Sequence, residues 1–441
     1  MGSYIPSTRE ERLEMLRAVG MRSFDELFAS VPETVRIQDL ALPEGLSEME
    51  VSEKLSAISQ KNTVFRSVFR GAGAYRHFIP AIVKTITGKE EFLTAYTPYQ
   101  AEISQGVLQS IFEYQTQICE LTGMDVSNAS VYDGAVAAAE AVLMNVDHKR
   151  KKSVVISETV NPDVLTTVKT YCASRNVPVT VIPAKGHLTD PAALQEALNT
   201  ETATVYVQTP NYYGLLEDAE EIVRLAHEAG AKAALGVNPI SLGLLKTPGE
   251  YGADIACGEG QPLGLPMGFG GPYLGFMATT RELMRKLPGR IVGETKDARG
   301  ERCFVLTLQA REQHIRRERA TSNICSNEAL CAMTASVYLA AMGPEGLRKA
   351  AEGSASHAHD LAGKLAGIPG FERTEEGEFF HEFLMTCPIC PHKLNEKLAE
   401  HGILGGLPVG KDILWCATEM NTKREIDELV LLVEKIVKEE G

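Results

Sequence analysis

The chain has 441 residues, of which 44% are hydrophobic and 23% charged, a composition close to that of ordinary globular proteins, so a disordered or fibrous protein is excluded. Lys and Arg number 44 against 58 Asp and Glu, and the resulting net charge of −14 argues against binding to nucleic acid or anionic lipid. No apolar stretch approaches the roughly 20 residues that cross a bilayer, and Met1–Arg12 are polar, so we expect no membrane contact and a cytoplasmic location.

The first 60 residues are predicted to form a helical arm. Stretches at 10–18, 23–29 and 47–59 are polar and amphipathic with helical periodicity, and Pro32 and Pro43 interrupt them. Such a segment is too polar to form a core. We therefore expect residues 1–60 to bury their apolar positions against a partner.

Residues 61–342 are predicted to form a large α/β domain with a mainly parallel sheet. From Val154 onward, short β-branched runs alternate with helical segments, which is typical of right-handed crossover units with helices on both sheet faces. The predicted strands are 154–157, 179–182, 205–208 and 233–237, with further strands at 255–257, 273–278 and 303–308, and the predicted helices are 164–175, 191–198 and 219–230.

Residues 343–441 are predicted to form a small α+β domain after a long helical pattern at 327–342. The predicted elements are a strand at 379–386, a helix at 393–401, a strand at 413–418 and a helix at 423–438. The last helix carries its apolar residues on one face, as docking against a small sheet requires.

A glycine-rich segment, Gly258–Pro272, holds six glycines and three prolines directly after a predicted strand. It matches neither a dinucleotide fingerprint, which opens a helix after the first strand, nor a P-loop, which needs Gly-Lys-Ser/Thr. A buried turn and a ligand-binding loop both remain open for Gly258–Gly271.

Asp133 precedes an Ala-rich helix predicted at 135–144. Small residues at a helix start can bind a phosphate through free backbone amides. The charge of Asp133 opposes a phosphate at this place, so we predict that Asp133 is the N-cap of the helix.

Nine cysteines, an odd number and mostly inside apolar runs, are typical of buried thiols in a reducing compartment. Cys387-Pro-Ile-Cys390-Pro-His392 contains residue types that bind zinc. A closed zinc site needs a fourth ligand and usually a second paired motif, and neither is visible. We predict two incidental thiols and no metal site.

A basic run from Arg311 to Asn327 leads into the helix predicted at 327–342. A solvated, salt-bridged helix face is one interpretation. The other is an anion-orienting or interface role for Arg316, Arg317, Arg319 and Asn323, because guanidinium groups bind carboxylate or phosphate in two-point geometry.

Three segments together resemble one known family. They are Thr94–Gly106 with FEYQT at 112–116, GADIACGEGQPLGLPMGFGGPYLGF at 252–276, and RRERATSNICSNEAL at 316–330. Over essentially its whole length the chain resembles the glycine decarboxylase P-proteins, and more narrowly the N-terminal half that many bacteria make as a separate subunit 1 (alpha). This resemblance implies the fold type I architecture of pyridoxal phosphate (PLP) enzymes, in agreement with the predicted sheet and small domain.

The resemblance also implies a reaction. P-proteins decarboxylate glycine and pass the aminomethyl group to the lipoyl arm of H-protein, with PLP as the electron sink. Where the lysine-bearing relatives supply a Schiff-base lysine, an acid for the pyridine nitrogen and a phosphate loop, this chain carries Gln261, Asn238 and Asp133. Glutamine forms no imine, an amide cannot keep the ring nitrogen protonated, and the aspartate repels phosphate, so we expect no PLP in this chain.

We therefore expect a subunit that completes the active site of a lysine-bearing subunit 2 (beta), which carries the PLP, in an assembly of two alpha and two beta chains. Tyr96, Tyr99 and Gln100 are the candidates for lining the partner's site, because their loop is too polar for ordinary core. Packing of the arm is the structural alternative for these tyrosines.

Two other functions remain open from the sequence. A self-sufficient PLP enzyme would need another lysine, and Lys246, beside Thr247-Pro248 in an expected exposed turn, is the nearest. A regulatory or scaffold protein would keep the fold and lose catalysis. A neighbouring gene for a chain with the missing lysine would distinguish these readings from the subunit hypothesis.

Overall fold

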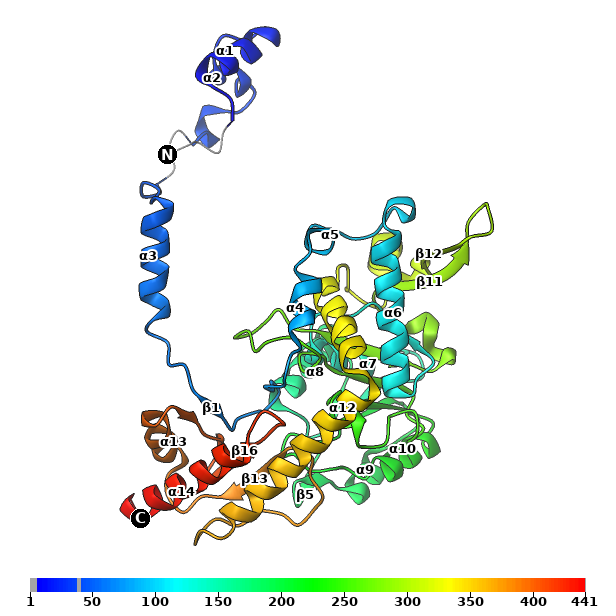
Figure 1. The fold of residues 1–441 in the computed structure, drawn as a ribbon. Coiled ribbons are helices and arrows are strands. Elements are labelled where there is room, and N and C mark those ends of the chain that lie inside the picture. The colour runs from blue at the N-terminus through cyan, green and yellow to red at the C-terminus, as the bar shows by residue number, and fades with distance from the viewer. Residues whose placement is uncertain (1–5, 38–40, 441) are drawn as a thin grey trace. The chain divides into compact units, whose positions relative to one another are not determined.

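The computed structural model describes residues 6–37 and 41–440, which fall into two compact units, Met1–Val64 and Phe65–Gly441. The first unit contains α1 (Arg9–Ala18), α2 (Phe24–Leu27), a 3-10 turn at Glu33–Val35 and α3 (Glu48–Ser59), drawn in blue in Figure 1. Reciprocal side-chain and backbone bonds at Thr8 and Glu11, and at Ser47 and Glu50, fix where α1 and α3 begin. The helices predicted for the arm are confirmed.

The arm leaves apolar side chains uncovered within its own unit. Helix α3 buries no side chain, and Met49, Leu55 and Ile58 on it are exposed. Among its described residues, only Leu16 of α1 is buried. Since the arm forms no core of its own, its helices need another surface to bury these positions.

The second unit is built on a seven-stranded sheet of order β2-β10-β9-β8-β7-β3-β4. Strands β4, β3, β7, β8 and β9 are parallel, and β10 runs antiparallel between β9 and β2. The strands are β2 (Val126–Ser127), β3 (Ser153–Ser157), β4 (Val179–Ile182), β7 (Thr202–Gln208), β8 (Lys232–Gly236), β9 (Ile255–Glu259) and β10 (Gly275–Thr279). The mainly parallel sheet predicted from the sequence is confirmed.

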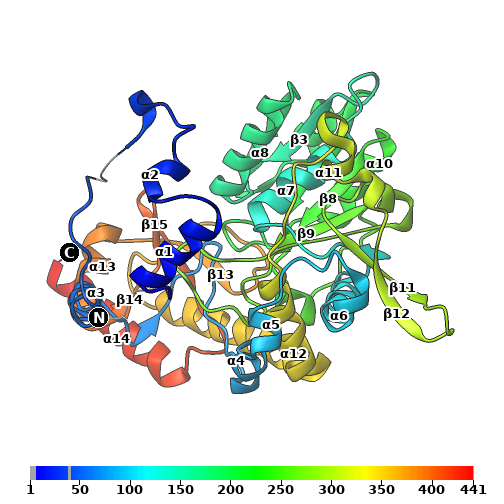
Figure 2. The same cartoon turned by 90° about the horizontal axis from the view of Figure 1, so that it is seen from above.

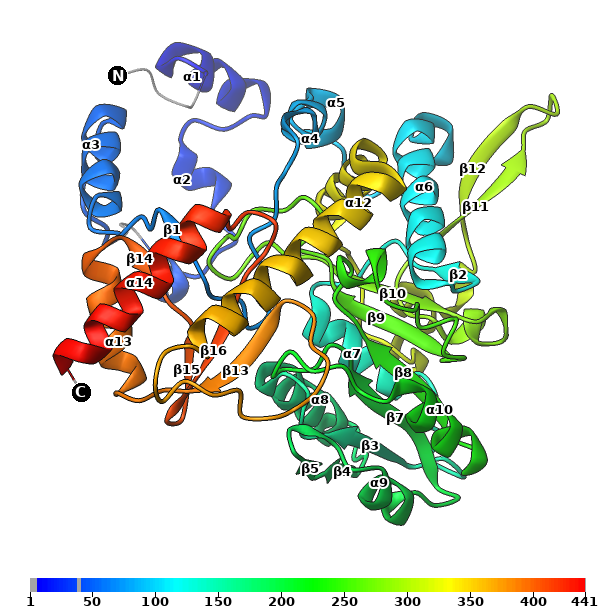
Figure 3. The same ribbon diagram turned by 60° about the horizontal axis from the view of Figure 1, so that its bottom comes forward.

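Helices cover both faces of this sheet because its buried strands are apolar on both sides (Figure 3). On β3, Val154 and Ile156 pack with α7 (Gly134–Leu143) and α8 (Pro162–Ser174), whereas Val155 faces the opposite core. That second core includes residues of α6 (Gln105–Thr122), α9 (Pro191–Ala197) and α10 (Ala219–Glu228).

A long helix, α12 (Ala329–Leu365), runs from beside α6 to beside the C-terminal helix (Figure 3). It bends at Gly343, whose φ of 60° interrupts the helical backbone immediately before Pro344. A positive φ favours glycine, and proline cannot continue the preceding hydrogen-bond ladder, so the kink follows from these two residues. It coincides with the predicted boundary between large and small domains, and that boundary stays a prediction.

The C-terminal part contains an antiparallel sheet of β13 (Glu382–Thr386), β16 (Asp412–Cys416) and β15 (Leu407–Val409). Helices α13 (Pro391–Glu400) and α14 (Lys423–Glu440) bury one apolar face each against its core around Trp415. A two-residue strand, β1 (Ser67–Val68), pairs in parallel with β14 (Ile403–Leu404). The segment that follows the arm thus joins the C-terminal layer, which the sequence did not predict.

The strand predicted at 303–308 exists as β12 (Arg302–Thr307), but it lies outside the main sheet. It pairs with β11 (Ile291–Lys296) in a hairpin that packs on α6 and extends beyond it (Figures 1 and 2). Before α6 come α4 (Ala81–Thr87), α5 (Glu90–Leu93) and a 3-10 turn at Ala101–Ile103. No helix in the described part of the chain is long and apolar enough to cross a membrane.

Candidate functional site

A cavity of about 360 Å³ lies at the carboxyl ends of β7, β8 and β9, the edge where open α/β sheets bind ligands. The strand ends contribute Gln208, Asn238 and Glu259, and the start of α7 contributes Asp133. The segment Gly71–Tyr75 forms the facing wall. The structure therefore brings Asn238 and Asp133 of the predicted positions to one cavity.

Asp133 caps α7 as predicted. Its backbone is extended, and its carboxylate accepts a hydrogen bond from the Val136 amide at 2.7 Å. The prediction of an N-cap at this residue is confirmed. The same geometry places a negative charge beside the amides at the start of α7.

Glu259, the last residue of β9, provides a second carboxylate at this helix start. It accepts hydrogen bonds from the amides of Gly134 at 2.9 Å, Gln261 at 2.9 Å and Leu274 at 3.0 Å. Burial raises the pKa of Glu259 to about 7, while these amide bonds oppose the rise. A Cβ at position 134 would lie 2.7 Å from the Glu259 nitrogen, so this close approach requires glycine.

Gln261 holds the cavity wall to the sheet. It is only 1% exposed; its Oε1 accepts from the Tyr75 amide at 2.9 Å, and its Nε2 donates to the carbonyls of Tyr75 at 3.0 Å and Leu265 at 2.7 Å. Glu382 of β13 holds the same wall by accepting from the Ala72 amide at 2.5 Å and the Tyr75 hydroxyl at 2.7 Å. Burial raises the pKa of Glu382 to about 7.

The side chain of Asn238 makes its hydrogen bonds with neutral groups. Its Oδ1 accepts from the Ile240 amide at 2.9 Å, and its Nδ2 lies 3.3 Å from Nε2 of His381. Burial first, and the neighbouring His77 second, lower the pKa of His381 far below its usual value, so the imidazole is uncharged at neutral pH.

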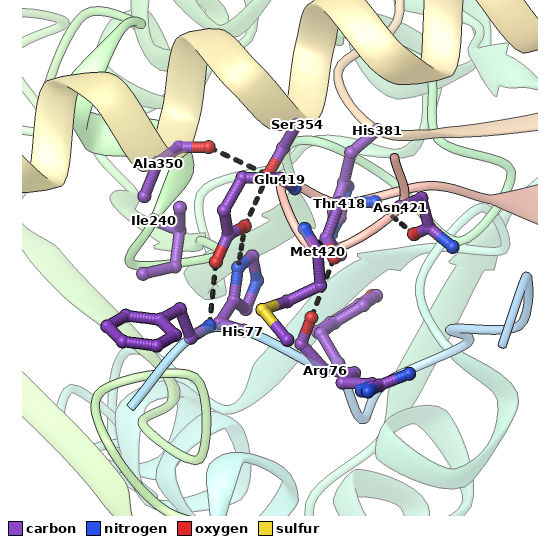
Figure 4. Close-up of polar contacts among 12 residues, drawn as sticks. Arg76, His77, Ile240, Ala350, Ser354, His381, Thr418, Glu419, Met420 and Asn421 are labelled. Carbon is purple, nitrogen blue, oxygen red and sulfur yellow. Dashed lines mark hydrogen bonds and ion pairs between the residues drawn. The ribbon is translucent and has the colours of Figure 1, made fainter. Parts of the chain in front are cut away.

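Next in the chain after this wall, a polar cluster joins Arg76 and the buried His77 to α12 and to the loop after β16 (Figure 4). The Glu419 carboxylate lies 2.7 Å from His77 Nδ1 and accepts from the Phe78 amide at 2.8 Å and the Ser354 hydroxyl at 3.1 Å. Burial is the largest single influence and tends to raise the pKa of Glu419, but the hydrogen bond and charge of His77 together with the backbone amides of Phe78 and Glu419 outweigh it and lower the pKa overall.

The loop from Tyr96 to Gln100 lies apart from the cavity, which none of its residues lines. Tyr96 is 81% and Tyr99 60% exposed, and Gln100 is exposed as well. The Tyr99 hydroxyl accepts a hydrogen bond from Arg290 at 3.2 Å, and its ring lies 5.4 Å from the guanidinium carbon. These tyrosines do not pack as core, so the loop presents polar side chains outward.

The basic run does not form the continuous helix face that one interpretation required. It contains only a four-residue helix at Gln313–Arg316 and a 3-10 turn at Arg317–Arg319. The side chains of Arg316, Arg317, Arg319 and Asn323 are exposed. The one ion pair found for these arginines within the described residues joins Arg319 to Glu318 at 3.9 Å.

Lys246 and the cysteine pair Cys387 and Cys390 are the remaining candidates from the sequence. Lys246 is exposed, as predicted, with its Nζ 3.5 Å from Glu220. Cys387 and Cys390 are free thiols, and over residues 6–37 and 41–440 no group of three or more His, Cys, Asp or Glu side chains is arranged to hold a metal ion.

Comparison with known proteins identifies the family. The family model for the glycine cleavage system P-protein matches residues 2–433. This chain belongs to the P-protein family. Among P-protein relatives, a probable glycine dehydrogenase (decarboxylating) subunit 1 of Desulfitobacterium hafniense is 48% identical over 97% of this chain and 98% of its own length. The corresponding protein of Moorella thermoacetica is 48% identical over 99% of this chain and all of its own.

A solved structure of the P-protein family has the same fold. A crystal structure described as glycine decarboxylase (P-protein) of the glycine cleavage system, in inhibitor-bound form, matches with a TM-score of 0.93 at 43% identity, over 99% of this chain and 100% of that one. A sphingosine-1-phosphate lyase of Burkholderia pseudomallei matches with a TM-score of 0.67 at 13% identity over 94% of both chains, a likeness of fold alone. The P-protein chain thus has the fold type I architecture predicted for it.

The cavity of this P-protein chain does not fit PLP. At the start of α7, the amides of Gly134 and Val136 already donate to the carboxyl groups of Glu259 and Asp133, so a phosphate would have to displace both groups to reach these donors. Asn238 offers no acid to a pyridine nitrogen. Gln261 is no amine, and its side-chain amide is bound on both sides by backbone groups.

The sequence missed Glu259, His381, Glu382 and Arg290. Glu259 stands in a glycine-rich segment directly after a predicted strand, so its place at the carboxyl edge of the sheet was the one available signal. The other three depend on burial by segments far away in the chain, which no local pattern shows.

Proposed function

We propose that this chain is subunit 1 of a two-subunit glycine decarboxylase of the glycine cleavage system. Membership of the P-protein family, with near-complete coverage of relatives named subunit 1, carries this proposal. With subunit 2, the enzyme decarboxylates glycine and transfers the aminomethyl group to the lipoyl arm of H-protein. The cytoplasmic location stays a prediction from the sequence.

We assign the PLP to subunit 2. The support is the mismatch between this chain's cavity and the cofactor, since the carboxyl groups of Glu259 and Asp133 occupy the amide donors that a phosphate needs. In this chain, the residues around the cavity at the carboxyl ends of β7, β8 and β9 then have a structural role. Gln261 and Glu382 hold Gly71–Tyr75 in place, and Glu259 binds the backbone amide of Gln261.

The contribution of this chain to catalysis is assigned to the loop of Tyr96, Tyr99 and Gln100, which orients groups in the partner's site. Its exposure and the fixed direction of the Tyr99 hydroxyl, held by Arg290, support this role. A phenol held in one direction costs little entropy when it donates to a reacting group. Arg316, Arg317, Arg319 and Asn323 are assigned to the interface or to orienting an anionic group, since they are exposed and mostly unpaired with acids.

The arm of residues 1–60 is assigned to assembly. Its exposed apolar residues on α3 match the need of an obligate interface, which commonly exceeds about 2,000 Å² in total. The proposed complex contains two copies of each subunit.

Co-expression with the candidate subunit 2 tests the function. We expect one complex that exchanges the carboxyl carbon of glycine with bicarbonate when H-protein is added, and PLP absorbance only on the separated subunit 2. Light scattering should give the mass of two plus two chains. A chain that stays monomeric with its candidate partner would contradict the proposal. If the complex assembles but subunit 2 catalyses the exchange equally well without this chain, only a scaffold role would remain for it.

A further inference from the structure

Among residues 6–37 and 41–440, Arg290 is the only buried lysine or arginine, with 3% of its surface exposed. It directly precedes β11, and its carbonyl accepts from the Ala129 amide at 2.8 Å, so its backbone is fixed against the start of the main sheet. A buried guanidinium costs several kcal/mol unless an anion compensates it, so its partners decide what it does.

The partners of Arg290 are neutral and distant. One terminal nitrogen donates to the Tyr99 hydroxyl at 3.2 Å and the other to Oδ1 of Asn327 at 3.3 Å, while Nε is buried without a partner. Charge-assisted bonds to an anion are shorter, at about 2.7–2.9 Å. The guanidinium is therefore held in place but poorly satisfied.

Arginines elsewhere in the chain show what a structural role looks like. Arg70 donates from Nε to the Gly405 carbonyl at 3.0 Å and from a terminal nitrogen to the Gly406 carbonyl at 2.9 Å. Backbone carbonyls carry concentrated negative charge and replace a counter-ion. Arg290 makes no such bond to any residue that the structure describes.

The surroundings add positive charge to this place. Arg311 donates to the carbonyls of Leu287 and, at 2.6 Å, Gly289, so a second guanidinium lies on the turn that leads into Arg290. Glu312 is buried next to Arg311 in the chain and forms no ion pair with Arg290 within 4.0 Å. Backbone carbonyls bind both terminal nitrogens of Arg311, and Glu312 lies 3.6 Å from His314, so among the described residues no carboxylate pairs with Arg290.

The groups around Arg290 are held in place by hydrogen bonds. Asn327 is fixed by bonds from its Nδ2 to the Ser130 hydroxyl at 2.9 Å and the Ala129 carbonyl at 3.2 Å. Ser130 has a φ of 138°, a strained conformation for a residue other than glycine, of the kind that clusters at ligand sites. Tyr99 covers the guanidinium from the exposed side, so a ligand reaches Arg290 by displacing or sharing the phenol.

We propose that Arg290, positioned by Asn327 and covered by Tyr99, forms a binding site for the carboxylate or phosphate group of a small molecule. A planar fork with an unpartnered Nε matches two oxygens of either group. Two sources carry this chemistry: an anion free in solution, and an anionic group bound in the assembled enzyme. The second source rests on the proposed function, whereas the first does not.

The first arm of the test uses the isolated full chain with inorganic phosphate or acetate as the probe, against chloride at matched ionic strength. We expect saturable shifts of the ¹⁵N–¹H signal of Arg290 Nε, which Arg290→Lys identifies by its loss, and a saturable rise of the thermal midpoint. Arg290→Lys and Arg290→Met should lose the midpoint response, and the matched control Arg70→Lys should keep it.

The second arm uses the complex with subunit 2. If the anion is the glycine carboxylate, Arg290→Met should raise KM for glycine about 10- to 100-fold with little change in assembly; if it is the cofactor phosphate, PLP should dissociate from the complex more readily by a similar factor. Removal of a poorly satisfied buried charge should leave the thermal midpoint of Arg290→Met unchanged or higher.

The outcomes separate cleanly. A response of the isolated chain with an unchanged complex assigns the site to a free anion, and the reverse assigns it to a group bound in the assembled enzyme. Wild-type behaviour of both Arg290 variants in both arms would overturn the site, as would a lower thermal midpoint of Arg290→Met without any anion effect, which defines a structural brace. If the wild-type complex does not form, the proposed function fails and the first arm alone decides the site.

Discussion

Gln261 stands where the lysine-bearing relatives are expected to carry the Schiff-base lysine. The substitution Gln261→Leu tests whether this side chain stabilises the fold by holding Gly71–Tyr75 in place. The substitution keeps the size of the side chain and removes three buried hydrogen bonds, two to Tyr75 and one to Leu265. Each bond contributes about 1 kcal/mol net, and a buried group left without a partner costs about 1–3 kcal/mol. We expect a loss of at least about 3 kcal/mol in the free energy of unfolding.

Urea denaturation followed by circular dichroism measures this loss from the midpoint, provided that the slope with urea stays constant. The matched control is Gln109→Leu on α6, where an exposed glutamine makes one bond to Glu113 at 2.8 Å; we expect a change within about 0.5 kcal/mol. If Gln261→Leu lost less than about 1 kcal/mol, or no more than the control, the three bonds would not hold the wall in solution.

Three further expectations concern the cofactor, pH and the exposed loop. Borohydride treatment of the isolated chain with PLP should give no stoichiometric pyridoxyl adduct, including on Lys246. Glu382 binds its proton more tightly in the folded chain, with a pKa of about 7 against 4.5, so stability falls as pH rises from about 4.5 through 7, and Glu382→Gln should remove up to about 3 kcal/mol of this fall in urea titrations. Tyr99→Phe should slow glycine–bicarbonate exchange about 5- to 150-fold with normal assembly, and Arg316→Ala and Arg317→Ala should weaken activity of the complex.

Each expectation has a result that contradicts it. A single lysine of this chain labelled at full occupancy would end the assignment of PLP to subunit 2. An unchanged pH profile of Glu382→Gln would mean that its carboxyl is not buried as described. If Tyr96→Phe, Tyr99→Phe and Gln100→Ala all exchange at the wild-type rate, the loop has a structural role only. If Arg316→Ala and Arg317→Ala both assemble and turn over as the wild type does, these arginines are merely solvent-exposed surface residues.

The sheet was predictable because its strands are local signals. Runs such as 154–157 and 179–182 are short, β-branched and bounded by helices or turns. The observed strands β3 and β4 cover almost the same residues as these two predicted runs. The N-cap at Asp133 was predictable for the same reason, since capping involves residues three positions apart.

What the sequence missed depends on contacts between distant segments. A bond between Glu259 and the Gly134 amide joins residues 125 positions apart, and no periodicity encodes it. The strand at 302–307 was recognised, but its pairing with 291–296 in a separate hairpin was not, because a strand's pattern does not name its partner. Arg290 gave no signal as a lone arginine between a glycine and an isoleucine, since burial arises only in the folded chain.

The pairing of β1 with β14 also orders events during synthesis. The Phe69 amide donates to the Leu404 carbonyl, and the Phe69 carbonyl accepts from the Cys416 amide. The partners of this early segment are therefore synthesised much later; Arg70 and its partner Gly405, for example, are 335 residues apart. At about 5–20 residues per second, the ribosome needs roughly 20 to 70 s to bridge this interval. Gln261 can bind the wall of Gly71–Tyr75 once the large sheet has been made, but the bonds from Glu382 and the pairing with β14 form only later, so nascent fragments that stop after the large sheet expose an unfinished edge.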